Sequence, residues 1–192
     1  MTPAKHFGNS SEIIDWDSII KEVDSLGANY SQCGGPTQWW RRKSNNYTPA
    51  YAKEVNDLVD TWDACNFNYD FIIVDEWFLD LDHEICKQFS KFVNATPELV
   101  YISRIMPGHG IPLHWDIDDQ ENKLLAKGKV RRFSAFISKP DFGHFFVIKD
   151  HNIYNQEQGS VWEWAHYRDE HIGTNFGLTP KYLFNFLGID NS

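Results

Sequence analysis

Hydrophobic positions near the start of the chain recur with helical spacing. The series consists of Ile13, Ile14, Trp16, Ile19, Ile20, Val23 and Leu26. It predicts a helix over about residues 12–26, which Gly27 would end. Residues 1–10 carry no such pattern and are expected to be loose. Residues 28–47 contain Gly34-Gly35-Pro36 and polar residues, which favours a long loop or a strand with loops. Long ordered loops in compact domains often act as lids.

Two further helices are predicted before the middle of the chain. Thr48 followed by Pro49 is typical of a helix N-terminus, and the apolar spacing after it predicts a helix to about residue 64. A strand is expected over residues 71–78. Asp82 is expected to cap a third helix over about residues 83–94.

The second half changes to short apolar runs separated by Gly, Pro and Asp turns. The predicted strands cover residues 99–105, 113–116, 132–138, 145–148, 160–164 and 182–187. Helices followed by a run of strands indicate an α+β chain. We expect a double-stranded β-helix (a jelly roll, as in cupins) with the N-terminal helices packed outside. The chain is predicted to be a single domain over residues 1–192, with residues 1–97 as support and a possible lid and residues 98–188 as the core.

Composition narrows the functional classes. The 192 residues carry a net charge of −9, which disfavours general binding to nucleic acid, and 16 % are aromatic, which suits a ring-lined interior. The three cysteines, Cys33, Cys65 and Cys86, form no CxxC pair. The N-terminus lacks the apolar segment of a signal peptide, and no run is long enough to span a membrane. We therefore expect a cytoplasmic protein.

The chemistry is expected at a His-x-Asp pair and two later residues. His114 and Asp116 are two positions apart, so on a strand their side chains leave the same face. With His171 they would give two imidazoles and one carboxylate. Such a triad covers one face of Fe(II) and leaves positions for a chelating co-substrate and O₂. Lys181, ten positions after His171, would pair with the distant carboxylate of 2-oxoglutarate.

The distal histidine has two candidates, His171 and His166. Lys181 follows them at ten and fifteen positions, respectively. Among the other histidines, His144 could face the cavity. His109 is expected in a loop, and the remaining ones are expected at the surface: His6, His83 and His151.

A wider set of residues in the C-terminal half extends this pattern. The set is the stretch Arg104-Ile105-Met106-Pro107-Gly108, then Ile111, His114, Asp116, Arg132, His171, Asn175, Gly177, Pro180 and Lys181. Over about residues 99–188 it resembles the aspartyl/asparaginyl β-hydroxylase-like branch of the Fe(II)/2-oxoglutarate-dependent oxygenases. That family usually has arginine at the position of Lys181 and often histidine at that of Ser134. Lysine supplies a point charge, whereas arginine supplies a bidentate fork.

The resemblance implies a role for each matching residue. His114, Asp116 and His171 would hold Fe(II), and Lys181 would bind 2-oxoglutarate. The further cofactor-binding residues would be Arg132, Ser134 and Asn175, of which Asn175 would orient His171 or bond its strand. His171 is preferred to His166 as the distal ligand because Asn175 and Lys181 follow it at the spacing of the family. The implied reaction hydroxylates an unactivated C–H bond with O₂ and releases succinate and CO₂.

The substrate side is less defined. An amino-acid-like or peptidyl substrate is implied. Arg104 could point outward or into the cavity, and we expect the cavity, where it would meet a substrate carboxylate. Tryptophans are candidates for the pocket wall: Trp39, Trp40, Trp115, Trp162 and Trp164. Two alternatives use the same ligands: a non-catalytic cupin-like protein that binds a metal or a small acid, and a Zn(II) or Mn(II) hydrolase or isomerase. The oligomeric state is not determined by the sequence.

Overall fold

The computed structural model describes residues 4–27, 53, 56–57, 59–61, 64, 71, 74–115, 124–164 and 169–192. These residues form two antiparallel sheets. The larger has the spatial order β1 (Lys5–Asn9), β8 (Ser160–Trp164), β5 (Val130–Phe136), β10 (Lys181–Asp190), β3 (Ala95–Ile105) and β2 (Asp75–Phe78). The smaller has the order β4 (His109–His114), β9 (His171–Asn175), β6 (His144–Ile148) and β7 (His151–Tyr154).

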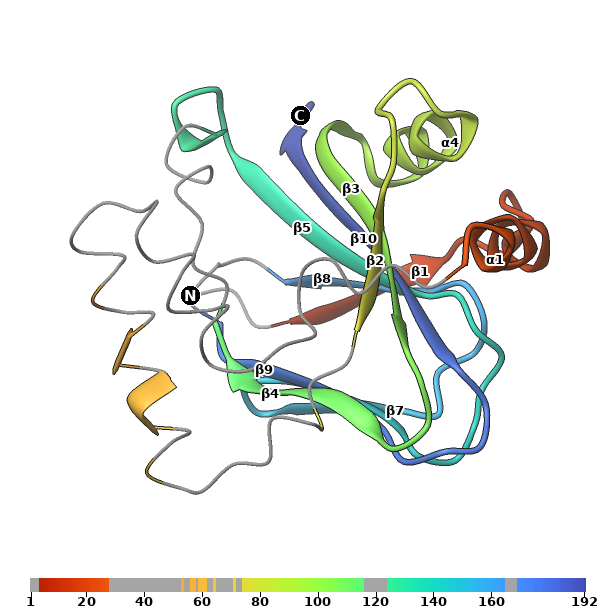
Figure 1. Cartoon of the computed structure of the whole chain (residues 1–192). Helices are drawn as coiled ribbons and strands as arrows, with labels where there is room; N and C mark the ends of the chain where they lie inside the picture. Colours follow the sequence, from red (N-terminus) through yellow and green to blue (C-terminus); the bar gives the residue numbers. More distant parts are fainter. Residues whose placement is uncertain are drawn as a thin grey trace.

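From β3 onward the chain crosses between the two sheets in a regular way. Strands β3, β5, β8 and β10 lie in the larger sheet, while β4, β6, β7 and β9 lie in the smaller one (Figure 1). Each sheet therefore interleaves strands that are distant in sequence. Eight strands wound in this manner make a double-stranded β-helix, or jelly roll. The expected fold class is confirmed.

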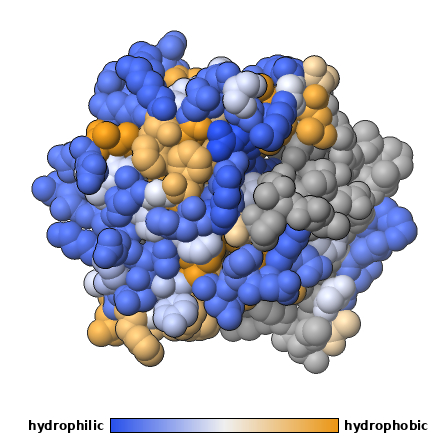
Figure 2. Space-filling model, turned by 180° about the vertical axis from the view of Figure 1, so that it is seen from behind, coloured by the Kyte–Doolittle hydropathy of each residue, from blue (hydrophilic) through white to orange (hydrophobic). Residues whose placement is uncertain are grey.

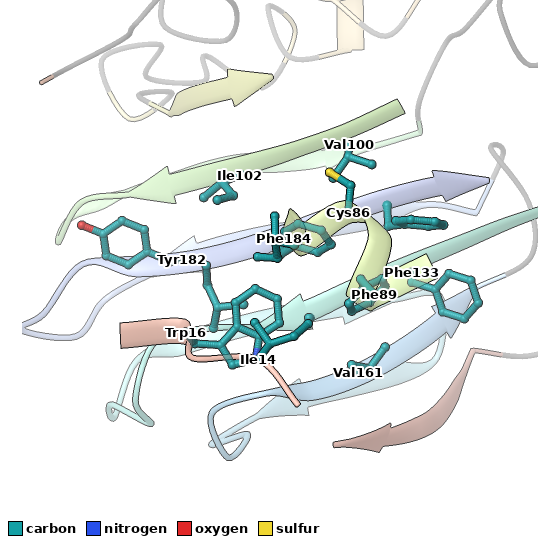
Figure 3. Packing of buried hydrophobic residues seen from close by; sticks show 14 of the residues in the cluster. Ile14, Trp16, Cys86, Phe89, Val100, Ile102, Phe133, Val161, Tyr182 and Phe184 are labelled. Atoms are coloured by element: carbon teal, nitrogen blue, oxygen red, sulfur yellow. The ribbon is translucent and has the colours of Figure 1, made fainter. Parts of the chain in front are cut away.

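Two helices cover the outer face of the larger sheet. Helix α1 (Trp16–Ser25) and helix α4 (Glu84–Val93) bring buried residues such as Trp16 and Phe89 against that sheet. Figure 3 shows Phe89 beside Phe184 of β10, with their ring centroids 4.8 Å apart. The expectation that the N-terminal helices pack outside the β-helix is confirmed for these two.

Strand alternation assigns the other face of the larger sheet to the interior. In β5, Phe133 and Ala135 belong to the helix-covered core, so Arg132, Ser134 and Phe136 point the opposite way. Phe136 packs with a second buried cluster that includes Phe146, Ile148, Trp164 and Leu183. The two sheets thus enclose a separate interior, and the candidate site lies there.

Several local predictions need correction. Residues 5–9 are not loose, because Lys5–Asn9 pair with β8 as an edge strand. Helix α1 begins at Trp16, since the Asp15 carboxylate caps it by accepting from the Ser18 N–H at 3.2 Å. Helix α4 is capped by His83, whose Nδ1 accepts from the Ile85 N–H at 3.3 Å, and not by Asp82.

Strand β4 also begins earlier than expected. Gly108 has a φ of +83°, which glycine adopts readily, and it closes the turn after Met106. His109 is therefore a strand residue and not a loop residue. Pro112 is accommodated because the pairing with β9 shifts register between Ile111 and His114.

The described residues of the predicted second helix, 53, 56–57, 59–61 and 64, are helical. The loop expected over 28–47 lies outside the described residues. Within the part of the chain that is described, no helix is long and apolar enough to cross a membrane. The described residues on the face seen in Figure 2 are mostly hydrophilic, with apolar areas in separate patches.

Candidate metal and co-substrate site

The two histidines predicted from sequence meet inside the β-helix. His114 ends β4, and His171 begins β9 directly opposite it in the strand pairing. Their ring centroids lie 4.2 Å apart. Both side chains are buried, with 6 % and 7 % of their surface exposed. Two residues 57 positions apart in sequence are thus held side by side by one antiparallel pair.

Each imidazole is oriented by the same kind of hydrogen bond. His114 Nδ1 lies 2.7 Å from the Pro112 carbonyl oxygen, and His171 Nδ1 lies 2.9 Å from that of Asp169. A carbonyl oxygen only accepts, so Nδ1 is the donor in both rings. In a neutral imidazole the lone pair then sits on Nε2. A backbone partner on the other nitrogen is the usual arrangement of a metal-binding histidine.

The third predicted ligand, Asp116, lies outside the described residues, as does the rejected alternative His166. Within the described ranges no group of three His, Cys, Asp or Glu side chains could hold a metal. Trp115 follows β4 directly and is half-buried. The two imidazoles fit the two nitrogen ligands of an iron site made of two histidines and one carboxylate. The carboxylate ligand, Asp116, stays a prediction.

Lys181 is fully buried at the start of β10. Its Nζ donates to the Phe145 carbonyl oxygen and lies 5.4 Å from the centre of the Phe146 ring and 5.9 Å from that of Phe136. Among the described residues, no carboxylate oxygen lies within 4.0 Å of it. Burial lowers the pKa of this ammonium to about 7. A buried cation with an apolar wall is suited to receive an anionic group.

Gly173 connects this cation to the histidine pair. It lies two residues after His171, so both positions face the same side of β9. A Cβ atom at Gly173 would lie 3.9 Å from Lys181 Nζ. The ammonium therefore sits about two residues, roughly 7 Å, along the strand from His171. An elongated small acid could contact both.

A chain of hydrogen-bonded side chains from the larger sheet packs against His171. Trp164 lies against His171, with ring centroids 4.8 Å apart. Its Nε1 donates to Ser134 Oγ at 3.3 Å, and Ser134 Oγ lies 3.0 Å from Asn185 Oδ1. Asn185 in turn donates to Ser103 Oγ at 3.1 Å. Ser134 is thus engaged in holding Trp164, and the structure does not place it beside Lys181.

Arg132 lies on the inner face of the larger sheet, as Lys181 does, but at a different position along the strands. Its guanidinium carbon is 5.2 Å from the centre of the Trp164 ring. In the strand register Arg132 pairs with Leu187, six residues beyond Lys181 on β10, which is about 20 Å along the strand. The expectation that Arg132 assists Lys181 at one carboxylate does not fit this register.

Asn175 has a structural role. Its Nδ2 donates to the carbonyl oxygens of Ile105 and Thr179, both at 2.8 Å, and its Oδ1 accepts from the Gly177 N–H at 2.9 Å. The amide therefore ties the end of β9 to the end of β3 and to the turn before β10. The structure gives it neither a contact with His171 nor a place at the co-substrate.

Arg104 points away from the interior, contrary to the expectation. It shares the helix-covered face of β3 with Ile102, whereas Ile105 faces inward beside Gly173. Its Nε and Nη2 donate to Asp75 Oδ2 at 2.9 and 2.7 Å, and Nη1 donates to Asp24 of α1 at 2.9 Å. These carboxylates hold its charge on the outer side of the sheet, so it does not meet a substrate in the cavity.

Two other expected residues lie at the margins of the site. Trp162 is partly buried and donates from Nε1 to Gln156 Oε1 at 2.9 Å. His144 is buried, with Nε2 2.9 Å from the Thr179 carbonyl oxygen, and burial lowers the pKa of its ring. It lies at the Lys181 end of the interior, since both residues border the turn before β10.

Sequence reasoning underrated Trp164 and did not single out Gly173. Trp164 is one of five tryptophans named as candidates for the pocket wall, and its ring lies against that of the ligand candidate His171. Both residues could have been found from the alternation of side chains between the two faces of a strand. Gly173 shares a face with His171, and Trp164 pairs with Arg132 in the register.

Comparisons with known proteins find likeness in solved structures only. No family model matches the chain, and no curated protein matches it significantly. A viral collagen prolyl hydroxylase from Paramecium bursaria Chlorella virus-1 has 16 % identity and a TM-score of 0.45, over 60 % of this chain and 78 % of that one. A Pseudomonas putida prolyl-4-hydroxylase has 12 % identity and a TM-score of 0.45, over 89 % and 98 %. A predicted oxalate decarboxylase from Thermotoga maritima has 13 % and 0.38, over 60 % and 80 %. Such distant likeness assigns no activity to this chain.

Proposed function

We propose that this protein is an Fe(II)- and 2-oxoglutarate-dependent dioxygenase that hydroxylates an unactivated C–H bond. The observation that carries the proposal is the position of Lys181. It is a fully buried ammonium, two strand positions from His171, which pairs with His114, and both of these buried imidazoles donate from Nδ1 to a backbone carbonyl oxygen. A metal site without an acidic co-substrate has no use for a buried cation at that depth, which burial alone makes costly.

Each residue of the site has a separate proposed role in binding the metal or in holding its ligands. His114, His171 and the predicted ligand Asp116 would hold Fe(II) on one face. The bound iron would supply oxygen activation, which side chains alone cannot provide. Both backbone carbonyls fix the imidazole orientation, and Trp164 limits the movement of His171. Rigid ligands keep the remaining coordination positions in place for the co-substrate and O₂.

Lys181 would anchor 2-oxoglutarate through the carboxylate far from the keto-acid end. The lysine Nζ lies close to the rings of Phe136 and Phe146, which would exclude water from the ion pair. The overall reaction balances as one O₂ and one 2-oxoglutarate per C–H bond. One oxygen atom enters the succinate carboxylate as CO₂ leaves, and the other becomes the hydroxyl group of the product.

The substrate is proposed to be amino-acid-like or peptidyl, as the resemblance to the aspartyl/asparaginyl β-hydroxylase-like branch implies. Trp115 is the proposed contact nearest to the metal, because it follows His114 directly and is half-buried. Arg104 is removed from the substrate side by its pairing with Asp75.

Succinate release tests the proposal. Purified protein with Fe(II), ascorbate and 2-oxoglutarate is expected to release succinate slowly even without a substrate, and Lys181→Met to reduce that rate at least tenfold at low 2-oxoglutarate. Zn(II) in place of Fe(II) should give none. Metal-loaded protein that neither binds nor consumes 2-oxoglutarate would contradict the proposal.

A further inference from the structure

The turn after β6 is linked to the segment that precedes His171. Lys149 lies directly after β6, with a φ of +50°, a conformation that non-glycine residues adopt rarely. Its backbone N–H donates to the Glu170 carbonyl oxygen at 2.8 Å. The neighbouring residue Ile148 pairs with His171 in the strand register. The turn therefore sits directly beside the first residue of β9.

The Lys149 side chain makes a second link to the same segment. Its Nζ lies 2.5 Å from Asp169 Oδ1. Asp169 is only 2 % exposed, whereas the lysine side chain keeps contact with solvent at 28 %. A carboxylate this deeply buried requires a compensating charge. Lys149 supplies it from the turn after β6.

Asp169 also contacts His171 through its main chain. The Asp169 carbonyl oxygen accepts the hydrogen bond from His171 Nδ1 at 2.9 Å. Asp169 therefore pairs with Lys149 through its side chain and orients the His171 ring through its backbone carbonyl. Residues 165–168, which precede it, lie outside the described ranges.

From this geometry we propose that Lys149 and Asp169 are positioning residues for His171, resting on the proposed function of His171 as a metal ligand. The ion pair fixes the peptide whose carbonyl orients the imidazole. Releasing the pair lets that carbonyl rotate, and His171 then loses its fixed ring orientation and its preference for the Nδ1–H form. Fe(II) affinity and the geometry of the site therefore depend on a charge pair that does not touch the metal.

The chain offers a matched control in another ion pair. Lys129 Nζ lies 2.7 Å from Asp190 Oδ2, and that carboxylate is also largely buried, at 6 % exposure. The pair joins the start of β5 to the end of β10 and involves no residue that contacts either histidine. Replacing Lys129 removes a lysine–aspartate ion pair far from the His171 segment, although Asp190 keeps Arg131 Nη1 at 3.6 Å.

The test measures Co(II) binding to the intact protein under anaerobic conditions, from its visible absorption. We expect Lys149→Met and Asp169→Asn to weaken Co(II) binding by about 10-fold or more, the usual effect of removing a group that orients a ligand. Lys149→Arg keeps the charge and should stay within about threefold of wild type. Lys129→Met should do the same, with any loss confined to thermal stability.

Two results would overturn the proposal. One is Co(II) affinity in Lys149→Met that stays within about twofold of wild type. The other is equal loss in Lys149→Met and Lys129→Met, which would show a general stability effect.

A second readout separates this proposal from the proposed function. ¹⁵N NMR of the metal-free protein reports which nitrogen of His171 carries the proton, with His171→Ala used for assignment. We expect the Nδ1–H form to dominate in wild type and to decrease in Lys149→Met but not in Lys129→Met. If wild type binds no Co(II), the function fails while the tautomer shift still supports the pair. An unchanged tautomer in all variants would overturn the positioning role whatever the metal result.

Discussion

His114 and His171 stand opposite each other across the β4–β9 pair, and each donates its Nδ1–H to the carbonyl oxygen two residues earlier in the chain. The same local device therefore orients both rings, although one histidine ends a strand and the other begins one. Both rings carry their proton on Nδ1, the form in which a histidine binds a metal through Nε2, and that makes the choice of ligands testable.

His171→Ala is predicted to abolish Fe(II) binding, because it removes one of two imidazoles that meet in the interior. His166→Ala is predicted to leave the affinity near that of wild type. Anaerobic equilibrium dialysis with Fe(II) measures both. The reverse pattern would show that the distal ligand was chosen wrongly.

Lys181→Met is predicted to weaken 2-oxoglutarate binding by at least tenfold while Fe(II) binding stays within about twofold. The substitution keeps an unbranched apolar side chain and removes the charge that would pair with the co-substrate, together with the hydrogen bond to the Phe145 carbonyl oxygen. Isothermal titration with metal-loaded protein gives both affinities. Unchanged 2-oxoglutarate affinity would place the anchoring cation elsewhere.

Lys181 should also make co-substrate binding depend on pH. Its pKa of about 7 in the free protein means that the ammonium loses its proton as the pH rises above that value. Binding an anion then requires proton uptake, so the Kd for 2-oxoglutarate should rise by up to about tenfold per pH unit above 7. Lys181→Arg, which stays charged, should flatten the profile in any variant that still binds. An equally steep rise in that variant would assign the titration to another group.

The same shift predicts an effect on stability. The unfolded chain holds the Lys181 proton up to a pH near 10.5, whereas the folded protein releases it near 7. The unfolded state thus binds more protons between these values, and folding stability rises with pH across that window. Lys181→Met should be more stable than wild type near pH 7, and the gap should narrow by up to about 1.4 kcal/mol per pH unit toward pH 10. Urea unfolding at several pH values measures it, and a constant gap would contradict the account.

Arg104→Met is predicted to lower the free energy of unfolding by about 3 kcal/mol or more, because it leaves the buried Asp75 carboxylate without its guanidinium partner. Fe(II) and 2-oxoglutarate affinities should not change in the folded variant. Chemical denaturation and the binding assays above measure the two effects. A selective loss of substrate turnover at unchanged stability would return Arg104 to the active site.

The sequence was sufficient for the parts of the site that depend on spacing. His114 and His171 meet as predicted, and Lys181 is buried near them. The fold class followed from the change of helical spacing to short strands. These features depend on local pattern, which a single sequence contains.

The orientation of Arg104 and the position of Arg132 could not be predicted, because they depend on how the strands pack and pair in the fold. Strand β3 is covered on one side by helices and on the other by the second sheet, so apolar residues occupy both faces and the pattern does not show where Arg104 points. Its partners, Asp24 and Asp75, are 80 and 29 positions away. The distance between Arg132 and Lys181 along the sheet is likewise set by the register of β5 on β10. That register cannot be read from the sequence of either strand alone.

The most direct test of the central claim is an anaerobic titration of Fe(II)-loaded protein with 2-oxoglutarate, followed by visible absorption. We predict a weak metal-to-ligand charge-transfer band that saturates with one equivalent of 2-oxoglutarate and that requires His114 and His171. The band would show that 2-oxoglutarate chelates the iron through its keto-acid end. Bound Fe(II) with no such band at saturating 2-oxoglutarate would contradict the oxygenase account.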